Sequence, residues 1–315
     1  MIEDKNKHIP VMTKEVIAGL NIKSNGIYID ATFGCGGHTR AILENLDPIA
    51  RLIVIDKDPK AITIAQRMKI RDKRIHILSG SYTQLLNFCR KQTITGNVNG
   101  ILLDLGVSSP QLDQASRGFS FKNDGPLDMR MNPDHGISAM KWLSEASIDK
   151  ISDVLKTYGE EKYSKKIARA IVNANRNKSI TTTKILANVI AQAHPNWRAC
   201  NKHPATKSFQ AIRIFINQEL EDLKKILNST ICVLAPGGRL VIISFHSLED
   251  RMVKQFISTQ VKGDKFPPKL PILASELNST MRKVGKVQKP SDTEIRSNIR
   301  ARSAILRVAE RLPEK

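Results

Sequence analysis

The sequence has few cysteines and none of them is paired in sequence. Its four cysteines stand far apart along the 315 residues, at Cys35, Cys89, Cys200 and Cys232, and form no C-x-x-C motif. This spacing excludes a disulfide scaffold and a zinc ribbon. Scattered cysteines are typical of proteins in a reducing compartment, so we expect a cytoplasmic protein.

Long hydrophobic runs and acidic residues are also scarce. No apolar run approaches the roughly 18 residues that a membrane-spanning helix needs, and residues 1–6 are polar, so we expect no membrane span and no signal peptide. Asp and Glu number 30 against 50 Lys and Arg, a formal net charge of +20. This excess favours a polyanionic partner, either nucleic acid or an anionic membrane surface.

Four short apolar runs dominate the first hundred residues and are separated by helical patterns. These runs are residues 27–30, 51–56, 75–78 and 101–105, with helical spacing over 39–46 and 59–68. Continuous apolar strands alternating with helices predict a parallel sheet that is covered on both faces. We therefore expect an α/β fold.

The pattern changes in the middle of the chain and then returns. Residues 112–206 contain no convincing buried strand, and helical periodicity dominates from Trp142 onward. A helical pattern over 208–227 then leads to the apolar run 239–244, and residues 303–308 fit an edge strand. The sequence predicts one α/β domain in two parts, residues 1–111 and 207–315, interrupted by a helical domain at 112–206.

A glycine-rich segment, Asp30-Ala-Thr-Phe-Gly-Cys-Gly-Gly-His38, links the first predicted strand to a helix. Glycines there let the backbone approach a ligand, and the helix N-terminus offers unpaired N–H groups. Asp56 ends the next strand, 22 residues after Gly34, where a carboxylate can accept both ribose hydroxyls of an adenosyl group. The alternative is an ordinary tight turn followed by a strand-end Asp.

The loop favours one adenosyl ligand over another. A dinucleotide fingerprint needs a third glycine where this chain has Thr39, which weakens a nicotinamide cofactor. Asp30 suits a ligand with an amino group and a sulfonium, as in S-adenosylmethionine. Asp104 ends the fourth strand beside the same crevice, where it would contact the ammonium group or an amine substrate; its alternative is a helix N-cap.

Three further features of the sequence suggest a functional site but also have an ordinary structural explanation. His246 and Glu249 resemble metal ligands, but no further ligand stands at metal-site spacing, so we expect no metal. Cys35 lies in the loop as a packing residue rather than a nucleophile. On a helix over residues 162–176, five basic residues share an arc of about 100° and apolar residues another. A merely solvated face is the alternative to an RNA-binding surface.

Four long blocks of the sequence together resemble one family. They are residues 30–40, 100–131 (GILLDLGVSSPQLDQASRGFSFKNDGPLDMRM), 203–213 and 237–251 (GGRLVIISFHSLEDR). They are similar to bacterial 16S ribosomal RNA (cytosine-N4) methyltransferases of the RsmH/MraW type, from His8 to Ser303. The resemblance implies a Rossmann-like, S-adenosylmethionine-dependent enzyme with an inserted helical domain. Its implied target is the N4 amine of a cytidine in the decoding (P-site) region of 16S rRNA, within the small ribosomal subunit.

The resemblance also assigns the cofactor contacts, and no catalytic residue or metal. The matching positions are Gly36, Gly37, His38, Asp56, Tyr82, Asp104 and Gln111. Relatives often have Phe where this chain has Tyr82, and Pro where it has Ile299, which affects only a local turn. Three alternatives stay open: an RNA-binding assembly factor with a vestigial site, a nicotinamide oxidoreductase, and a methyltransferase that acts on small molecules or protein.

Overall fold

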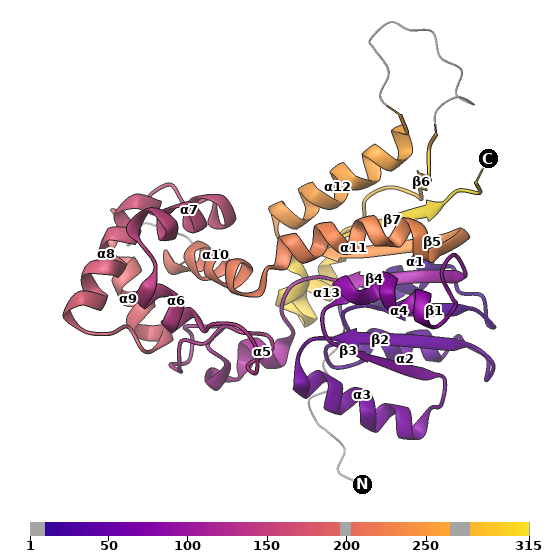
Figure 1. Cartoon of the computed structure of the whole chain (residues 1–315), viewed down its shortest axis with the longest axis horizontal. Helices are drawn as coiled ribbons and strands as arrows, with labels where there is room; N and C mark the ends of the chain where they lie inside the picture. Colours follow the sequence, from indigo (N-terminus) through magenta and orange to yellow (C-terminus); the bar gives the residue numbers. More distant parts are fainter. Residues whose placement is uncertain (1–9, 196–202, 265–277, 315) are drawn as a thin grey trace, which may run out of the picture. The chain divides into compact units, whose positions relative to one another are not determined.

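The computed structural model describes residues 10–195, 203–264 and 278–314. The chain divides into two compact units, residues 1–106 with 220–315 and residues 107–219 (Figure 1). The second unit continues past residue 206, where the sequence pattern placed its end, because helix α10 (Ala205–Asn217) packs against the helices of that unit.

A seven-stranded sheet of order β3-β2-β1-β4-β5-β7-β6 forms the centre of the first unit. Its strands are β1 (Ile27–Asp30), β2 (Arg51–Asp56), β3 (Ile75–Ser79), β4 (Val98–Asp104), β5 (Leu234–Ser244), β6 (Met281–Lys283) and β7 (Ile305–Arg311). The first five strands run parallel, and β7 lies antiparallel between β5 and β6. The expected Rossmann-like class is confirmed. The edge position expected for 303–308 is wrong, because the short strand β6 pairs with the outer side of β7.

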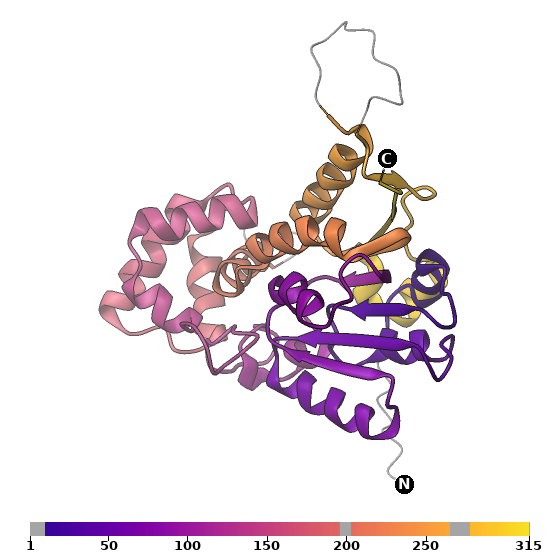
Figure 2. The same cartoon turned by 45° about the vertical axis from the view of Figure 1, so that its right-hand side comes forward.

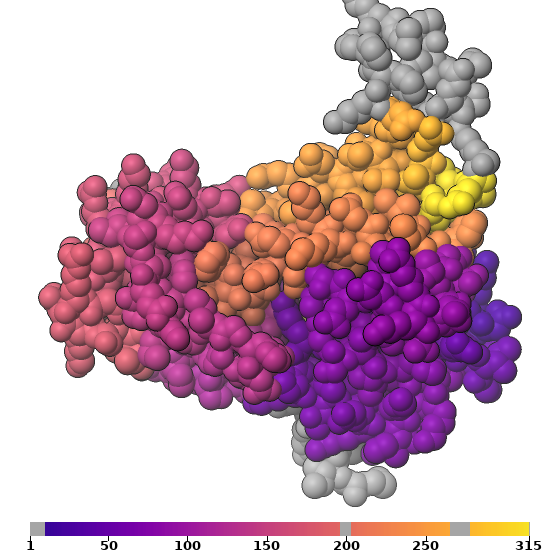
Figure 3. Space-filling model, viewed as in Figure 1, coloured from indigo at the N-terminus to yellow at the C-terminus, as the bar shows by residue number. Residues whose placement is uncertain are grey.

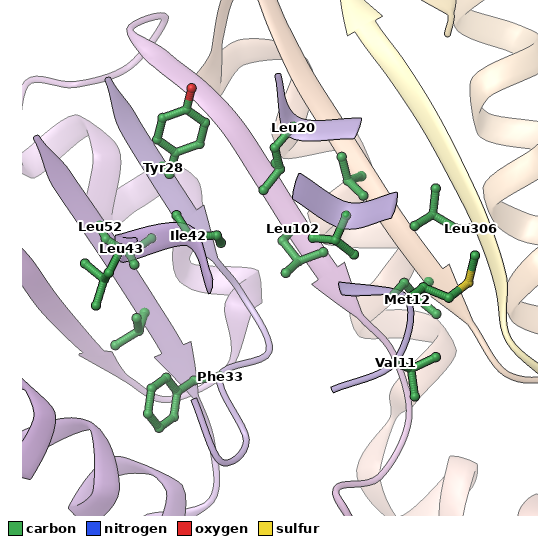
Figure 4. Close-up of a cluster of buried hydrophobic side chains, with 14 of the residues drawn as sticks. Val11, Met12, Leu20, Tyr28, Phe33, Ile42, Leu43, Leu52, Leu102 and Leu306 are labelled. Atoms are coloured by element: carbon green, nitrogen blue, oxygen red, sulfur yellow. The ribbon is translucent and has the colours of Figure 1, made fainter. Parts of the chain in front are cut away.

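Helices cover both faces of this sheet, which explains its continuous apolar strands. The core on one face lies under α1 (Thr13–Leu20), α2 (Gly37–Leu43) and α3 (Pro59–Arg71). In Figure 4, Ile42 lies near Leu52 and Leu20 lies near Leu102, while Leu306 of β7 lies near Met12. The helices α4 (Leu85–Lys91), α11 (Glu219–Val233) and α12 (Ser247–Lys262) follow on the other side, where α11 and α12 form much of the orange surface in Figure 3.

The second unit is helical, as expected for the insertion. Its helices are α5 (Ser109–Asp113), α6 (Ala139–Glu145), α7 (Ile148–Gly159), α8 (Ser164–Asn177), α9 (Thr183–Ala193) and α10 (Figure 2). They enclose a core of their own that includes Trp142, Leu155, Ile167 and Phe209. The second unit therefore has the buried apolar centre of a separately packed body.

The long helical pattern over 208–227 is two helices rather than one. Gln218 separates α10 from α11 and has a left-handed backbone with φ of 53°. Asn217, just before the break, is buried; its side-chain N–H donates to the Met129 carbonyl at 2.7 Å, and its Oδ1 accepts from the Met131 N–H at 2.7 Å. The left-handed Gln218 ends α10, and these bonds hold the last residue of the helix to the segment 129–131 of the second unit.

Candidate active site

Two glycines in the loop between β1 and α2 have backbone conformations that residues with side chains rarely adopt. Gly34 and Gly36 have φ of 54° and 72°, in the left-handed region. A Cβ on Gly36 would lie 2.8 Å from both Met68 Sδ and the Phe33 ring. There is therefore no room for a side chain at residue 36. Helix α2 begins at the next residue, Gly37.

Asp30 holds this loop together from beneath. Its carboxylate is 1% exposed, accepts the Thr39 hydroxyl at 2.6 Å and accepts the Thr32 N–H at 3.2 Å. The Thr32 hydroxyl in turn accepts the Asp104 N–H at 2.6 Å, which joins the loop to the end of β4. Burial raises the pKa of Asp30, against the opposing effect of the Thr39 bond. Asp30 therefore supports the site from inside the protein, and no sequence pattern indicates the roles of Thr32 and Thr39.

His38 and Asp104 face each other at the opening of the loop. His38 is 5% exposed, and its Nε2 lies 3.5 Å from Asp104 Oδ2. Both ring nitrogens of His38 and Oδ1 of Asp104 are buried without a hydrogen bond to the described residues. Burial acts to lower the pKa of His38, but the neighbouring Asp104 and Asp30 outweigh it and raise that pKa. Buried polar atoms are rarely left unsatisfied, so this pair is built to meet a polar ligand.

Asp56 lies at the end of β2, next to the same loop. Its Oδ2 accepts the Gly34 N–H and its Oδ1 accepts the Asp58 N–H, both at 2.8 Å. Burial raises the pKa of Asp56 to about 6, despite these two bonds. Each oxygen keeps a further lone pair, so an ionised Asp56 still has capacity to accept two hydroxyl groups.

Tyr82 lies beyond the end of the neighbouring strand. Asp56 pairs with Ser79 across β2 and β3, and the Gly80 N–H donates to the Asp56 carbonyl at 2.8 Å. Tyr82 follows in a short helical turn, Tyr82–Gln84, with a half-buried side chain. Its ring is thus carried at the same edge of the sheet as the Asp56 carboxylate.

Six of the seven expected cofactor residues therefore lie at the carboxyl ends of adjacent strands in the first unit. They are Gly36, Gly37 and His38 after β1, Asp56 after β2, Tyr82 after β3 and Asp104 after β4. Gln111 belongs to the second unit, where it is buried in α5 and its Oε1 accepts the Ser108 N–H at 2.9 Å. A role for Gln111 in cofactor binding stays a prediction.

The remaining candidates have local structural roles. His246 and Glu249 form the capping box of α12, and the buried Glu249 accepts the N–H groups of Phe245 and His246 at 2.9 and 3.3 Å. Cys35 is half-buried, and burial raises the pKa of its thiol although Arg40 opposes this. A raised pKa disfavours the thiolate and therefore a nucleophilic role.

The site passes a test of fit for S-adenosylmethionine. The glycine loop admits a ligand against the backbone, Asp56 can accept ribose hydroxyls, and the unsatisfied atoms of His38 and Asp104 suit an amino-acid group that carries both charges. A 3-2-1-4-5-7-6 sheet with an antiparallel β7 and this ligand edge defines a Rossmann-like methyltransferase that uses S-adenosylmethionine.

Comparison with known sequences specifies the family. The profile of the MraW methylase family matches residues 5–312, and the chain belongs to this family.

Among the described residues, no helix is both long and apolar enough to span a bilayer.

Several solved structures share only a distant likeness. A Clostridium thermocellum protein provisionally assigned as an rRNA methylase has 10% identity and a TM-score of 0.45, over 98% of this chain and 99% of its own. An rRNA methylase from Streptococcus thermophilus has 12% identity and a TM-score of 0.40, over 96% and 94%. A Streptococcus mutans protein crystallised with SAH has 14% identity and a TM-score of 0.39, over 97% and 100%.

Proposed function

We propose that the protein transfers a methyl group from S-adenosylmethionine to the N4 amine of a cytidine in the P-site region of 16S rRNA, within the small ribosomal subunit. The pair of the buried His38 and the half-buried Asp104, with three buried polar atoms that have no hydrogen bond to the described residues, supports the cofactor half of this proposal. The four sequence blocks and the net charge of +20 support the RNA half. Such a substrate places the enzyme in the cytoplasm.

The chain's own residues divide the work of cofactor binding. Asp56 accepts the ribose hydroxyls, Tyr82 stacks on the adenine, and Gly36 and Gly37 present their backbone to the ligand. His38 and Asp104 hold the amino-acid end. The cofactor supplies an electrophilic methyl group on a positively charged sulfur.

Catalysis rests mainly on positioning. The N4 lone pair of cytosine is delocalised into the ring, so the amine needs a hydrogen-bond acceptor that exposes it for in-line attack. With Asp104 on the amino-acid end, a backbone carbonyl in the segment 106–110 accepts the N4–H; the alternative is that Asp104 accepts the N4–H instead of contacting the amino-acid group. No general base is required, because the proton leaves after methyl transfer, when the amine is strongly acidic.

The target base has to leave its stack before N4 is accessible. Binding of the surrounding RNA is supported by α8, whose two faces are cleanly separated. Ile167 and Ile171 are buried, and the basic residues Lys165, Lys166, Arg169 and Arg176 are exposed. Lys162, the fifth basic residue of the predicted helix, is also exposed but lies in the turn before α8, which begins at Ser164. This arrangement provides phosphate contacts on a helix that is anchored by its other face.

The test uses the full chain with methyl-labelled S-adenosylmethionine and small ribosomal subunits that lack their own modifications. After digestion of the RNA, we expect the label in N4-methylcytidine. Label in another nucleoside would retain an RNA methyltransferase and refute the cytosine-N4 assignment. Cofactor binding without any RNA label would refute the RNA substrate.

A further inference from the structure

We propose that Phe245 is the stacking surface for the target cytosine; this inference rests on the proposed function and extends it to the substrate side of the site. Phe245 immediately follows β5, which ends at Ser244. Ligands of open α/β sheets bind beyond the carboxyl ends of the strands, and Phe245 lies at that edge.

The register of the sheet places Phe245 beside the end of β4. Asp104 pairs with Ile243, and the Leu105 N–H donates to the Ile243 carbonyl at 3.0 Å. Phe245 is two residues beyond Ile243, as Gly106 is two residues beyond Asp104. The aromatic ring and the segment that begins at Gly106 therefore emerge next to each other.

Gly106 lies next to the Phe245 ring and has few other neighbours on its side-chain side. Gly106 has a φ of +95°, a conformation that side-chain-bearing residues rarely adopt. A Cβ built there would have one described neighbour within 4 Å, Phe245 Cδ2 at 4.0 Å. The Gly106 carbonyl is one of the acceptors that the proposed function offers to N4–H, and a base held there by its amine would lie close to the Phe245 ring.

Phe245 is also rigidly mounted. Glu249 is 2% exposed, and its Oε2 accepts the Phe245 N–H at 2.9 Å and the His246 N–H at 3.3 Å. Part of the Phe245 ring packs against the sheet core, and the side chain stays partly exposed. A fixed, half-exposed ring loses little entropy when a base stacks on it.

The other described aromatic residues that follow parallel strands of the first unit, Phe33 and Tyr82, have other roles. Phe33, after β1, is 3% exposed and belongs to the core. Tyr82, after β3, is assigned to the adenine. Among the described residues of the first unit that follow a parallel strand, Phe245 remains, next to the strand end that carries Asp104. Stacking on an aromatic ring is the sequence-tolerant part of single-stranded base recognition.

The test compares Phe245→Leu, Phe245→Tyr and the control Phe256→Leu, which removes another half-buried aromatic ring, in α12. Steady-state methylation of unmodified small subunits gives kcat and KM, and calorimetry gives the Kd of S-adenosylmethionine. We expect Phe245→Leu to lower kcat/KM for the subunit about tenfold or more, with the cofactor Kd within about twofold of wild type. Phe245→Tyr and Phe256→Leu should keep most of the activity.

Two results would overturn the inference. One is an unchanged kcat/KM in Phe245→Leu; the other is an equal loss in Phe256→Leu, which would indicate a general packing effect. The product formed by the wild-type enzyme separates this proposal from the one on which it rests. If wild type makes no N4-methylcytidine, the proposed function fails; if it does and Phe245→Leu matches it, only the role of Phe245 fails.

Discussion

His38 Nε2 lies 3.5 Å from Asp104 Oδ2, so the first turn of α2 and the end of β4 meet through the buried His38 and the half-buried Asp104. This separation is within ion-pair distance. Nevertheless Nδ1 and Nε2 of His38 and Oδ1 of Asp104 have no hydrogen bond to the described residues. A ligand that satisfies those three buried atoms gains hydrogen bonds that are stronger than the same bonds in water.

The first prediction concerns this pair. His38→Asn and Asp104→Asn should each weaken binding of S-adenosylmethionine, because each alters a polar group that we propose the amino-acid end of the ligand contacts. The double variant should lose less than the sum of the two, with a coupling energy of about 0.5–3 kcal/mol. Calorimetric Kd values for the four proteins measure this coupling, and additive losses would show that the residues act separately.

Asp56→Ala should weaken cofactor binding by about 2 kcal/mol, which corresponds to about 30-fold in Kd. The variant loses a charged acceptor for two hydroxyl groups. Circular dichroism of the apo protein checks that the loop retains its fold, since Gly34 and Asp58 also lose their acceptor. An unchanged Kd would remove Asp56 from the site.

Binding should also depend on pH through Asp56. Burial raises the pKa of this carboxyl to about 6, so it is largely ionised at pH 7.5 and protonated at pH 5. The ionised form accepts the hydroxyl groups, and affinity should therefore fall as the pH decreases through about 6. Kd values measured between pH 5 and 8 test this.

His38 and Asp30 also lie near this part of the site, and Asp56→Asn separates their titration from that of Asp56. The amide variant should lose the inflection near pH 6 that Asp56 causes. If wild type and Asp56→Asn show the same pH profile, another group is responsible.

Two glycines with similar backbones but different surroundings allow a matched comparison. Gly36 and Gly96 have φ of 72° and 76°; a Cβ would collide with Phe33 and Met68 at Gly36 and would meet nothing within 4 Å at Gly96. Both alanine variants carry left-handed strain of about 1–2 kcal/mol. Gly36→Ala should lose about 1–3 kcal/mol more through overpacking. Equal melting temperatures for the two variants would contradict this packing.

The basic face of α8 should contribute to RNA binding. Replacing Lys165, Lys166 and Arg169 by Glu should weaken RNA binding and reduce the slope of log K against log salt by about 0.7–0.9 for each lost phosphate contact. The control replaces Arg67, Lys69 and Arg71, which are exposed on and at the end of α3, with the same change in net charge. Equal effects in both variants would show that net charge alone matters.

The sequence predicted the parallel strands and the glycine loop well, because strands buried on both faces are continuous apolar runs. It did not predict the support beneath the loop. Thr32 and Thr39 are ordinary loop and helix residues until folding brings Asp30 and the Asp104 N–H within 2.6 Å of their hydroxyls.

The break between α10 and α11 and the strand β6 were missed for related reasons. Gln218 adopts its left-handed φ of 53° with neither glycine nor proline to signal it. β6 has three residues, two of them exposed and basic, so it has no apolar pattern and exists only through its pairing with β7. Both features depend on tertiary contacts that no local pattern contains.

The pairing of β4 with β5 has a consequence for synthesis of the chain. On the ribosome, β4 is complete more than a hundred residues before β5, and residues 107–219 are made in between. Until then one side of β4 is an open strand edge, which is a template for incorrect pairing. Because the intervening residues bury a core of their own, they can fold during this interval. Substitutions that slow the folding of residues 107–219 should therefore lower the yield of protein with a correctly formed seven-stranded sheet, although these residues lie outside the sheet.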